Sequence, residues 1–224
     1  MALERAKCLI IGSLVVCSIG LVFYIIGFST PNWLEADRRY TTTSHFVRIG
    51  LWEACFEQWS YYKDYTGKQY NGCWWIFSYE YRPIWQWLNP PWFLAIQVIM
   101  TICLILELVA ELILVMFIVG CCPGTKSFVA LFALSAIQLL AGLLTALCVI
   151  MFGTKSVVDR QWIEKPDQNY LSWSFGLMVL SGFCQLFGGM CSVVAAMQVR
   201  LENQKNKPKE RYEGYVMSTQ PPHY

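Results

Sequence analysis

Residues 92–119 read WFLAIQVIMTICLILELVAELILVMFIV, an apolar run that decides the fold class. The run contains no lysine or arginine, and its only acidic residues are Glu107 and Glu111. About twenty apolar residues in a helix suffice to cross the hydrocarbon of a bilayer. Three further runs of the same character occupy residues 8–28, 127–152 and 171–199. The sequence therefore predicts a membrane protein with four transmembrane helices, the second spanning residues 92–120.

Composition agrees with this prediction. The 224 residues are 56% hydrophobic and 14% charged, whereas about a quarter of a soluble domain is charged. The net charge is only +2 and no basic stripe interrupts the apolar runs, which argues against a nucleic-acid partner. Membrane lipid is the partner that the composition indicates.

The connecting segments predict the orientation. Positive charge is denser in the short segments 1–7, 121–126 and 200–224 than in the long segments 29–91 and 153–170. The positive-inside rule therefore places both termini in the cytosol and the two long segments outside the cell as loops. The tail 200–224 is polar and lacks apolar periodicity, so we expect it to be disordered.

Eight of the ten cysteines lie in or beside the apolar runs, and only Cys55 and Cys73 lie in a long polar segment. An oxidising compartment would pair these two and leave the others as small packing residues. The same segment is rich in tryptophan and tyrosine. Its stretches 46–52 and 74–77 are β-branched and aromatic, which favours strands.

A set of residues in this segment resembles a family signature. Trp33, the triplet Gly50, Leu51 and Trp52, and then Cys55 and Cys73 follow the order W…GLW…C…C. This order resembles that of claudins and their relatives, which include peripheral myelin protein-like proteins and gamma subunits of calcium channels. The helix count and loop lengths are also similar. The resemblance covers nearly the whole chain except the tail.

The resemblance implies a left-handed bundle of four transmembrane helices with a small extracellular antiparallel β-sheet. In such a scaffold Trp33 and Trp52 anchor the sheet to the helix ends, and a Cys55–Cys73 disulfide joins two strands. Seventeen residues separate these cysteines, more than in vertebrate claudins. That spacing fits a claudin-like protein of invertebrate septate junctions better than a vertebrate tight-junction channel.

The chain departs from channel-forming claudins beside the cysteines. Channel formers place charge there, whereas this chain has Phe56, Trp74 and Trp75, which we interpret as a candidate interface for association. Glu53 and Glu57 share strand parity with Cys55. They are weak candidates for residues that face a pore.

Two carboxyls lie inside a predicted span. Glu107 and Glu111 are four residues apart and share one helix face. Gln138 and Gln185 fall at similar depth in the third and fourth spans, which predicts a polar layer within the bundle. One interpretation is proton or ion handling, since intramembrane carboxylates are functional candidates. The other is a structural layer of protonated carboxyls, which we favour.

The predicted cytosolic segments carry two short motifs. Cys121 and Cys122 lie beside the membrane and are candidates for palmitoylation, unmodified buried thiols being the alternative. The chain ends in PPHY, and Pro221, Pro222 and Tyr224 match the pattern that WW domains bind. A PDZ-binding end is absent, because the last residue is not aliphatic.

Enzyme signatures are absent: no phosphate-binding loop or nucleophile motif occurs, and the two histidines lie too far apart for a metal site. We therefore predict no enzyme, cofactor or metal. The leading hypothesis is a claudin-like junction protein at lateral plasma-membrane contacts, which seals the paracellular space through association with itself or similar proteins in cis and trans. The alternatives are an auxiliary subunit of an ion channel or receptor, and a paracellular ion pore.

Overall fold

The computed structural model describes residues 2–37, 39, 45–61, 63, 67–120, 127–163 and 165–219, with only the backbone described for residues 2–5, 127 and 206–219. Four long helices dominate this part of the chain: α1 (Ala2–Ser29), α3 (Pro91–Ile118), α4 (Ser127–Val158) and α5 (Trp173–Thr219). Each contains an apolar stretch long enough to cross a membrane: Ala6–Ser29, Pro91–Ile118, Phe128–Val158 and Trp173–Lys205. The prediction of four spans is therefore confirmed.

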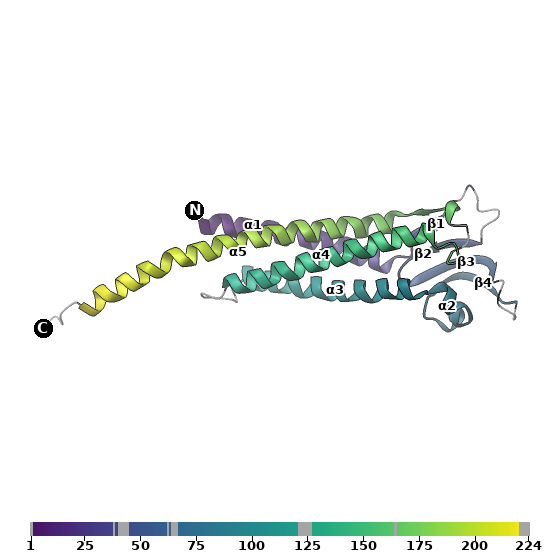
Figure 1. Cartoon of the computed structure of the whole chain (residues 1–224), viewed down its shortest axis with the longest axis horizontal. Coiled ribbons are helices and arrows are strands. Elements are labelled where there is room, and N and C mark those ends of the chain that lie inside the picture. The colour runs from purple at the N-terminus through teal and green to yellow at the C-terminus, as the bar shows by residue number, and fades with distance from the viewer. Residues whose placement is uncertain are drawn as a thin grey trace.

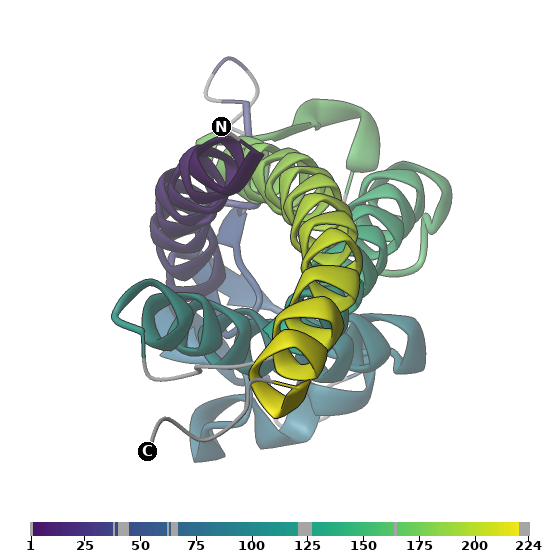
Figure 2. The ribbon, with the colours of Figure 1, turned by 90° about the vertical axis from the view of Figure 1, so that its left-hand side faces the viewer.

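The four helices form a ring, in which α1 packs against α3 and α5, and α4 packs between α3 and α5 (Figure 2). Small residues let α1 approach α5 closely, since a Cβ on Gly20 would lie 2.7 Å from Cβ of Cys184. The hydroxyl of Ser13 donates a hydrogen bond to the Gly188 carbonyl at 2.9 Å and lies 2.8 Å from the Ser192 hydroxyl. The small residues of α5 thus serve packing within the monomer.

A five-stranded antiparallel sheet closes one end of the bundle, and both termini lie toward the other end (Figure 1). The sheet order is β4-β3-β2-β1-β5. Its strands are β1 (Leu34–Ala36), β2 (Phe46–Ile49), β3 (Glu53–Ser60), β4 (Gln69–Trp75) and β5 (Asn169–Leu171). Short helical turns complete this end: η2 (Tyr79–Ile84), α2 (Trp85–Leu88) and η3 (Pro166–Gln168).

Strand β5 comes from the segment that we predicted as a loop, residues 153–170. In the structure α4 continues to Val158, and Asn169–Leu171 pair with β1. The amide of Ser172 then donates to the carbonyl of Trp33 at 2.9 Å. Three residues are too few to show the alternation that marks a strand, so the sequence carried no signal for β5.

Two tryptophans join the sheet to the helix ends. Trp33 is buried, and its indole donates a hydrogen bond to the Gly27 carbonyl in the last turns of α1 at 2.7 Å. Its ring packs edge-on against Phe152 of α4, with centroids 4.9 Å apart. Trp52 packs edge-on against Phe28 at 5.2 Å. The sheet therefore rests directly on the ends of the spans.

The tail differs from the sequence expectation. We expected the fourth span at residues 171–199 and a disordered tail from residue 200, but α5 begins at Trp173 and continues to Thr219. A helix that is already formed extends at little cost, because the unfavourable nucleation step is past. The helix also continues past Pro208 and Gly214, two residue types that ordinarily interrupt helices.

Candidate functional site

The face of the sheet opposite its buried side chains carries a row of functional groups, one from each strand. Register places Tyr170 opposite Glu35, Glu35 opposite Arg48, Arg48 opposite Cys55, and Cys55 opposite Cys73. Directly opposed residues of antiparallel strands point to the same face. We call this row of five residues the open-face row. It unites the first and second connecting segments in one surface.

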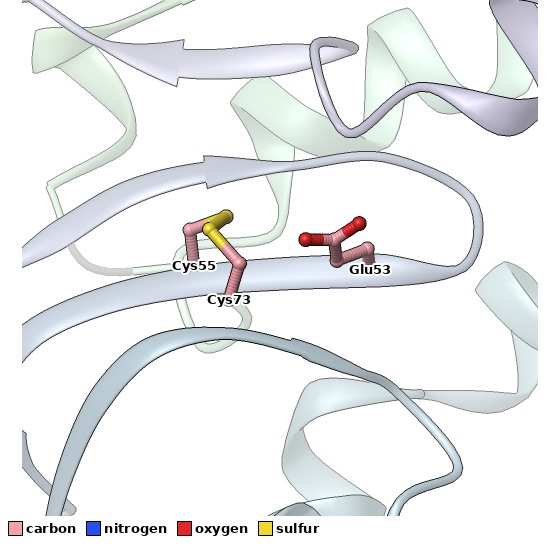
Figure 3. Close-up of side chains that lie close together, drawn as sticks. All are labelled: Glu53, Cys55 and Cys73. Carbon is pink, nitrogen blue, oxygen red and sulfur yellow. A yellow bond between two sulfur atoms is a disulfide. The ribbon is translucent and has the colours of Figure 1, made fainter.

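A disulfide joins β3 and β4 at one end of this row. Cys55 and Cys73 are bonded, as the sequence predicted, and Figure 3 shows Glu53 on the same face beside them. Nε of Arg48 lies 3.4 Å from the sulfur of Cys55. A Glu53 oxygen and both sulfurs lie within 4.8 Å of one another. Because the sulfurs are bonded to each other, this group offers a metal ion only one carboxylate.

Glu35 is the one carboxylic acid of the open-face row. Its carboxylate accepts a short hydrogen bond from Asn32 and a 2.8 Å bond from the Tyr170 hydroxyl. Burial opposes ionisation of this carboxyl, but hydrogen bonds from Asn32, Tyr170 and Ser172 outweigh that effect and lower its pKa. Arg48 adds a favourable charge. The hydrogen bond from Tyr170 to Glu35 thus joins β5 to β1.

The three predicted interface residues separate in the structure. Trp74 and Trp75 lie at the end of the edge strand β4 and are 47% and 57% exposed. Phe56 is only 2% exposed, so its assignment to an interface is wrong. Phe56 points to the face opposite Cys55, where its ring stacks on Trp59 at a centroid distance of 4.7 Å. It belongs to the core.

The two acids proposed to face a pore do not form a single acidic lining. Glu53 is partly buried beside the disulfide, and Glu57 is exposed. Glu57 borders a concavity of about 550 Å³ whose wall also contains Arg48 and Glu35. A cation and two acids therefore share this hollow, and the open face carries mixed charge.

Two exposed aromatic residues beyond the disulfide were not predicted. Phe77 and Tyr79 follow β4, and Tyr79 is 82% exposed. The ring of Phe77 contacts those of Trp52 and Trp75, with centroids 6.3 and 5.7 Å away. The stretch of aromatic residues from Trp74 was visible in the sequence, but the exposure of each ring depends on the turn that follows β4.

The predicted polar layer lies inside the bundle. Glu107, Gln138 and Gln185 are buried and come from α3, α4 and α5. Glu111 is only partly buried and accepts a short hydrogen bond from Ser18 of α1. Among the described residues, neither carboxyl oxygen of Glu107 has a hydrogen-bond partner. All four spans thus contribute polar groups near one level.

The remaining predicted sites lie outside the described residues. These are the candidate palmitoylation sites Cys121 and Cys122, and the WW-domain motif at Pro221, Pro222 and Tyr224.

Four apolar helices with a disulfide-joined antiparallel sheet at one end define a four-span membrane protein with a β-sheet cap. The family described as PMP-22/EMP/MP20/Claudin tight junction matches residues 18–193, from α1 through the sheet to α5, and the chain belongs to this family. A comparison with curated proteins found no match. The family is structural and junctional rather than enzymatic. The match confirms the resemblance that the tryptophan, GLW and cysteine pattern indicated.

Proposed function

We propose that this protein seals the space between neighbouring cells by association of its sheets at lateral plasma-membrane contacts. In this proposal the sheet faces outward and both termini are cytosolic. The orientation is supported by the disulfide, which needs an oxidising compartment, and by the termini lying at the other end of the bundle. The partners are other copies of the chain or similar proteins, in cis and in trans.

One observation carries the proposal: two half-exposed tryptophans at the edge of the sheet. Among the described strands, β4 pairs only with β3, so it is an edge strand of the sheet. An aromatic side chain contributes 150–250 Å² of apolar surface. Burying the exposed half of Trp74 or Trp75 against a neighbour is worth about 2–3 kcal/mol at about 25 cal/mol per Å².

A selective pore is less well supported. Ion selectivity from side chains needs a ring or lining of one charge sign. Glu57 instead shares its hollow with Arg48, and Glu53 lies against the disulfide. An auxiliary-subunit role has no separate observation in its favour, although the family includes it by resemblance.

The proposal is tested by expressing the protein, with and without replacement of both tryptophans, in cells that otherwise lack junctions formed by claudin-like proteins. The double variant Trp74→Ser, Trp75→Ser should reduce enrichment at cell–cell contacts at least tenfold while surface expression stays normal. The matched control is Trp173→Ser, since Trp173 is also half-exposed but lies at the start of α5. Equal enrichment of the double variant and the wild type would overturn the proposal.

Two finer proposals concern the cytosolic side. The PPHY end would bind a WW domain, which a peptide of residues 200–224 should show and its Tyr224→Ala form should not. Cys121 and Cys122 would be palmitoylated, and hydroxylamine-sensitive acyl exchange should label the wild type but not the double Ser variant.

A further inference from the structure

A concavity of about 770 Å³ lies in the segment between β4 and α3. Its wall combines three aromatic side chains, Phe77, Tyr79 and Trp85, with the guanidinium of Arg82. The rings of Phe77 and Trp85 have centroids 6.3 Å apart. Figure 1 shows α2, which begins with Trp85, beside the sheet end of α3.

This concavity lies at the level where the spans end. Helix α2 ends at Leu88, and α3 begins three residues later at Pro91. On its other side, Phe77 contacts Trp52, which in turn contacts Phe28 in the last turn of α1. The polar headgroups of a bilayer occupy the zone directly beyond the hydrocarbon. Aromatic residues concentrate at that level in membrane proteins.

The cation in the wall is available to a ligand. Glu80, the only acid between residues 77 and 86, accepts an ion pair from Lys68 at 2.9 Å. Arg82 is exposed and makes no ion pair within the part of the chain that the structure describes. The Ser78 hydroxyl, which also borders the concavity, is buried and has no hydrogen-bond partner among the described residues. Both are donors for a phosphate.

The aromatic rings recognise the opposite charge. Quaternary ammonium groups bind to cages of aromatic rings through cation–π attraction, and they need no hydrogen-bond acceptor. A primary ammonium does need acceptors, and the carboxylate of Glu80 is already engaged by Lys68. A ligand that fits both halves of the wall therefore carries a phosphate next to a quaternary ammonium.

We propose that this concavity binds the phosphocholine headgroup of a bilayer lipid in the leaflet on the sheet side. The phosphate pairs with Arg82 and Ser78, and the choline lies among Phe77, Tyr79 and Trp85. The acyl chains extend along the spans into the same leaflet. The site borders the sealing edge, since the ring of Phe77 contacts that of Trp75 at 5.7 Å, but Arg82 and Tyr79, which the test replaces, do not belong to that edge.

The test uses the full chain purified in a maltoside detergent, with lipid binding measured by native mass spectrometry. Dioleoyl lipids with phosphocholine, phosphoethanolamine and phosphoglycerol headgroups are compared at equal concentration. We expect the phosphocholine lipid to bind at least tenfold more tightly than the other two. Arg82→Gln and Tyr79→Ser should each weaken it about tenfold, the effect of losing one charge-assisted hydrogen bond or a desolvated cation–π contact.

Trp173→Ser is the matched control, since it removes a half-exposed aromatic residue from another span end and should leave phosphocholine binding unchanged. Both test side chains are exposed, and unchanged melting temperatures in detergent would confirm intact folds. Equal binding of all three lipids, or full affinity in Arg82→Gln, would overturn the proposal. Tighter binding of the phosphoglycerol lipid would show that the site recognises only an anion. Soluble phosphocholine that binds as tightly as the lipid would show that the ligand is not a lipid. Either of these two results would also overturn the proposal.

Discussion

The disulfide between Cys55 and Cys73 closes a loop of 18 residues and holds the edge strand β4 to the sheet. In the chain-entropy model such a loop stabilises the fold by about 3 kcal/mol. The double variant Cys55→Ser, Cys73→Ser should therefore unfold at lower denaturant concentration and reach the surface poorly. Cys191→Ser is the control, because that cysteine is a free thiol within α5.

Mass spectrometry of non-reduced protein from the cell surface should recover the two peptides linked. Free thiols at both positions in surface-expressed protein would contradict the proposed orientation, although not the family.

Glu35 gives the sheet a predictable response to pH. The pKa of its carboxyl is lowered in the folded state, so its contribution is complete above the pKa of the unfolded chain, about 4.3 for glutamate. That contribution is lost as the pH falls through the lower, folded value. The melting temperature of the wild type should therefore drop on acidification below about pH 4, relative to Glu35→Gln.

Glu57→Gln, which removes an exposed acid of the same face, is the matched control for the loss of one carboxylate. If the melting temperature of Glu35→Gln fell as steeply with pH as that of the wild type, the hydrogen bonds with Tyr170 and Asn32 would not depend on the charge of this residue.

At the scale of elements, the polar layer tests how the helices tolerate carboxyls in the membrane. A charged carboxylate that faces lipid costs roughly 2.5–3.5 kcal/mol, and the described spans offer Glu107 no cation. Gln at both Glu107 and Glu111 keeps hydrogen bonding, so folding and surface delivery should stay close to normal. Leu at both removes the acceptor of the Ser18 hydroxyl, at a cost of about 1–3 kcal/mol, and should lower surface levels.

Surface biotinylation measures both variants against the wild type. A Gln pair that reaches the surface normally but abolishes barrier function would favour the ionic interpretation over the structural one.

The elements also show what the sequence could and could not predict. Hydropathy alone located the four spans, because a helix that crosses the hydrocarbon must be predominantly apolar along about twenty residues. It did not locate their ends, since α4 continues through Lys155, and α5 continues into the polar tail and past Pro208, a residue that usually ends a helix. The signature cysteines predicted the disulfide. The hydrogen bond between Glu35 and Tyr170 could not be predicted, because Tyr170 lies in a three-residue strand of another segment.

Phe56 shows the same limit within one strand. Its neighbour Cys55 was assigned correctly to the disulfide, but the face of each residue follows from register. Register placed Phe56 opposite Phe46 in the core, with ring centroids 6.0 Å apart.

At the scale of the whole molecule, the family defines a scaffold, and surfaces on that scaffold decide what it does. The cap presents an aromatic edge at Trp74 and Trp75, a mixed-charge open face and a concavity at membrane level. Under the proposed function, a barrier would follow from the first of these, through association of caps along this edge. A pore would follow from the second only if one charge sign prevailed.

Removal of the protein from a polarised epithelial sheet should therefore raise leakage of small ions of both signs and of neutral tracers together. The physical reason is that loss of cap-to-cap contact opens a gap, and a gap does not select by charge. Transepithelial resistance, dilution potentials and flux of an uncharged tracer measure the three consequences. Re-expression of Trp173→Ser should restore all three, whereas the double variant Trp74→Ser, Trp75→Ser should not.

If removal instead lowers conductance for one ion sign while tracers stay excluded, the protein is a pore, with Glu53 and Glu57 as the first residues to change. If the barrier stays intact but gating of a co-purifying channel changes, the protein is an auxiliary subunit, and the aromatic edge binds that channel.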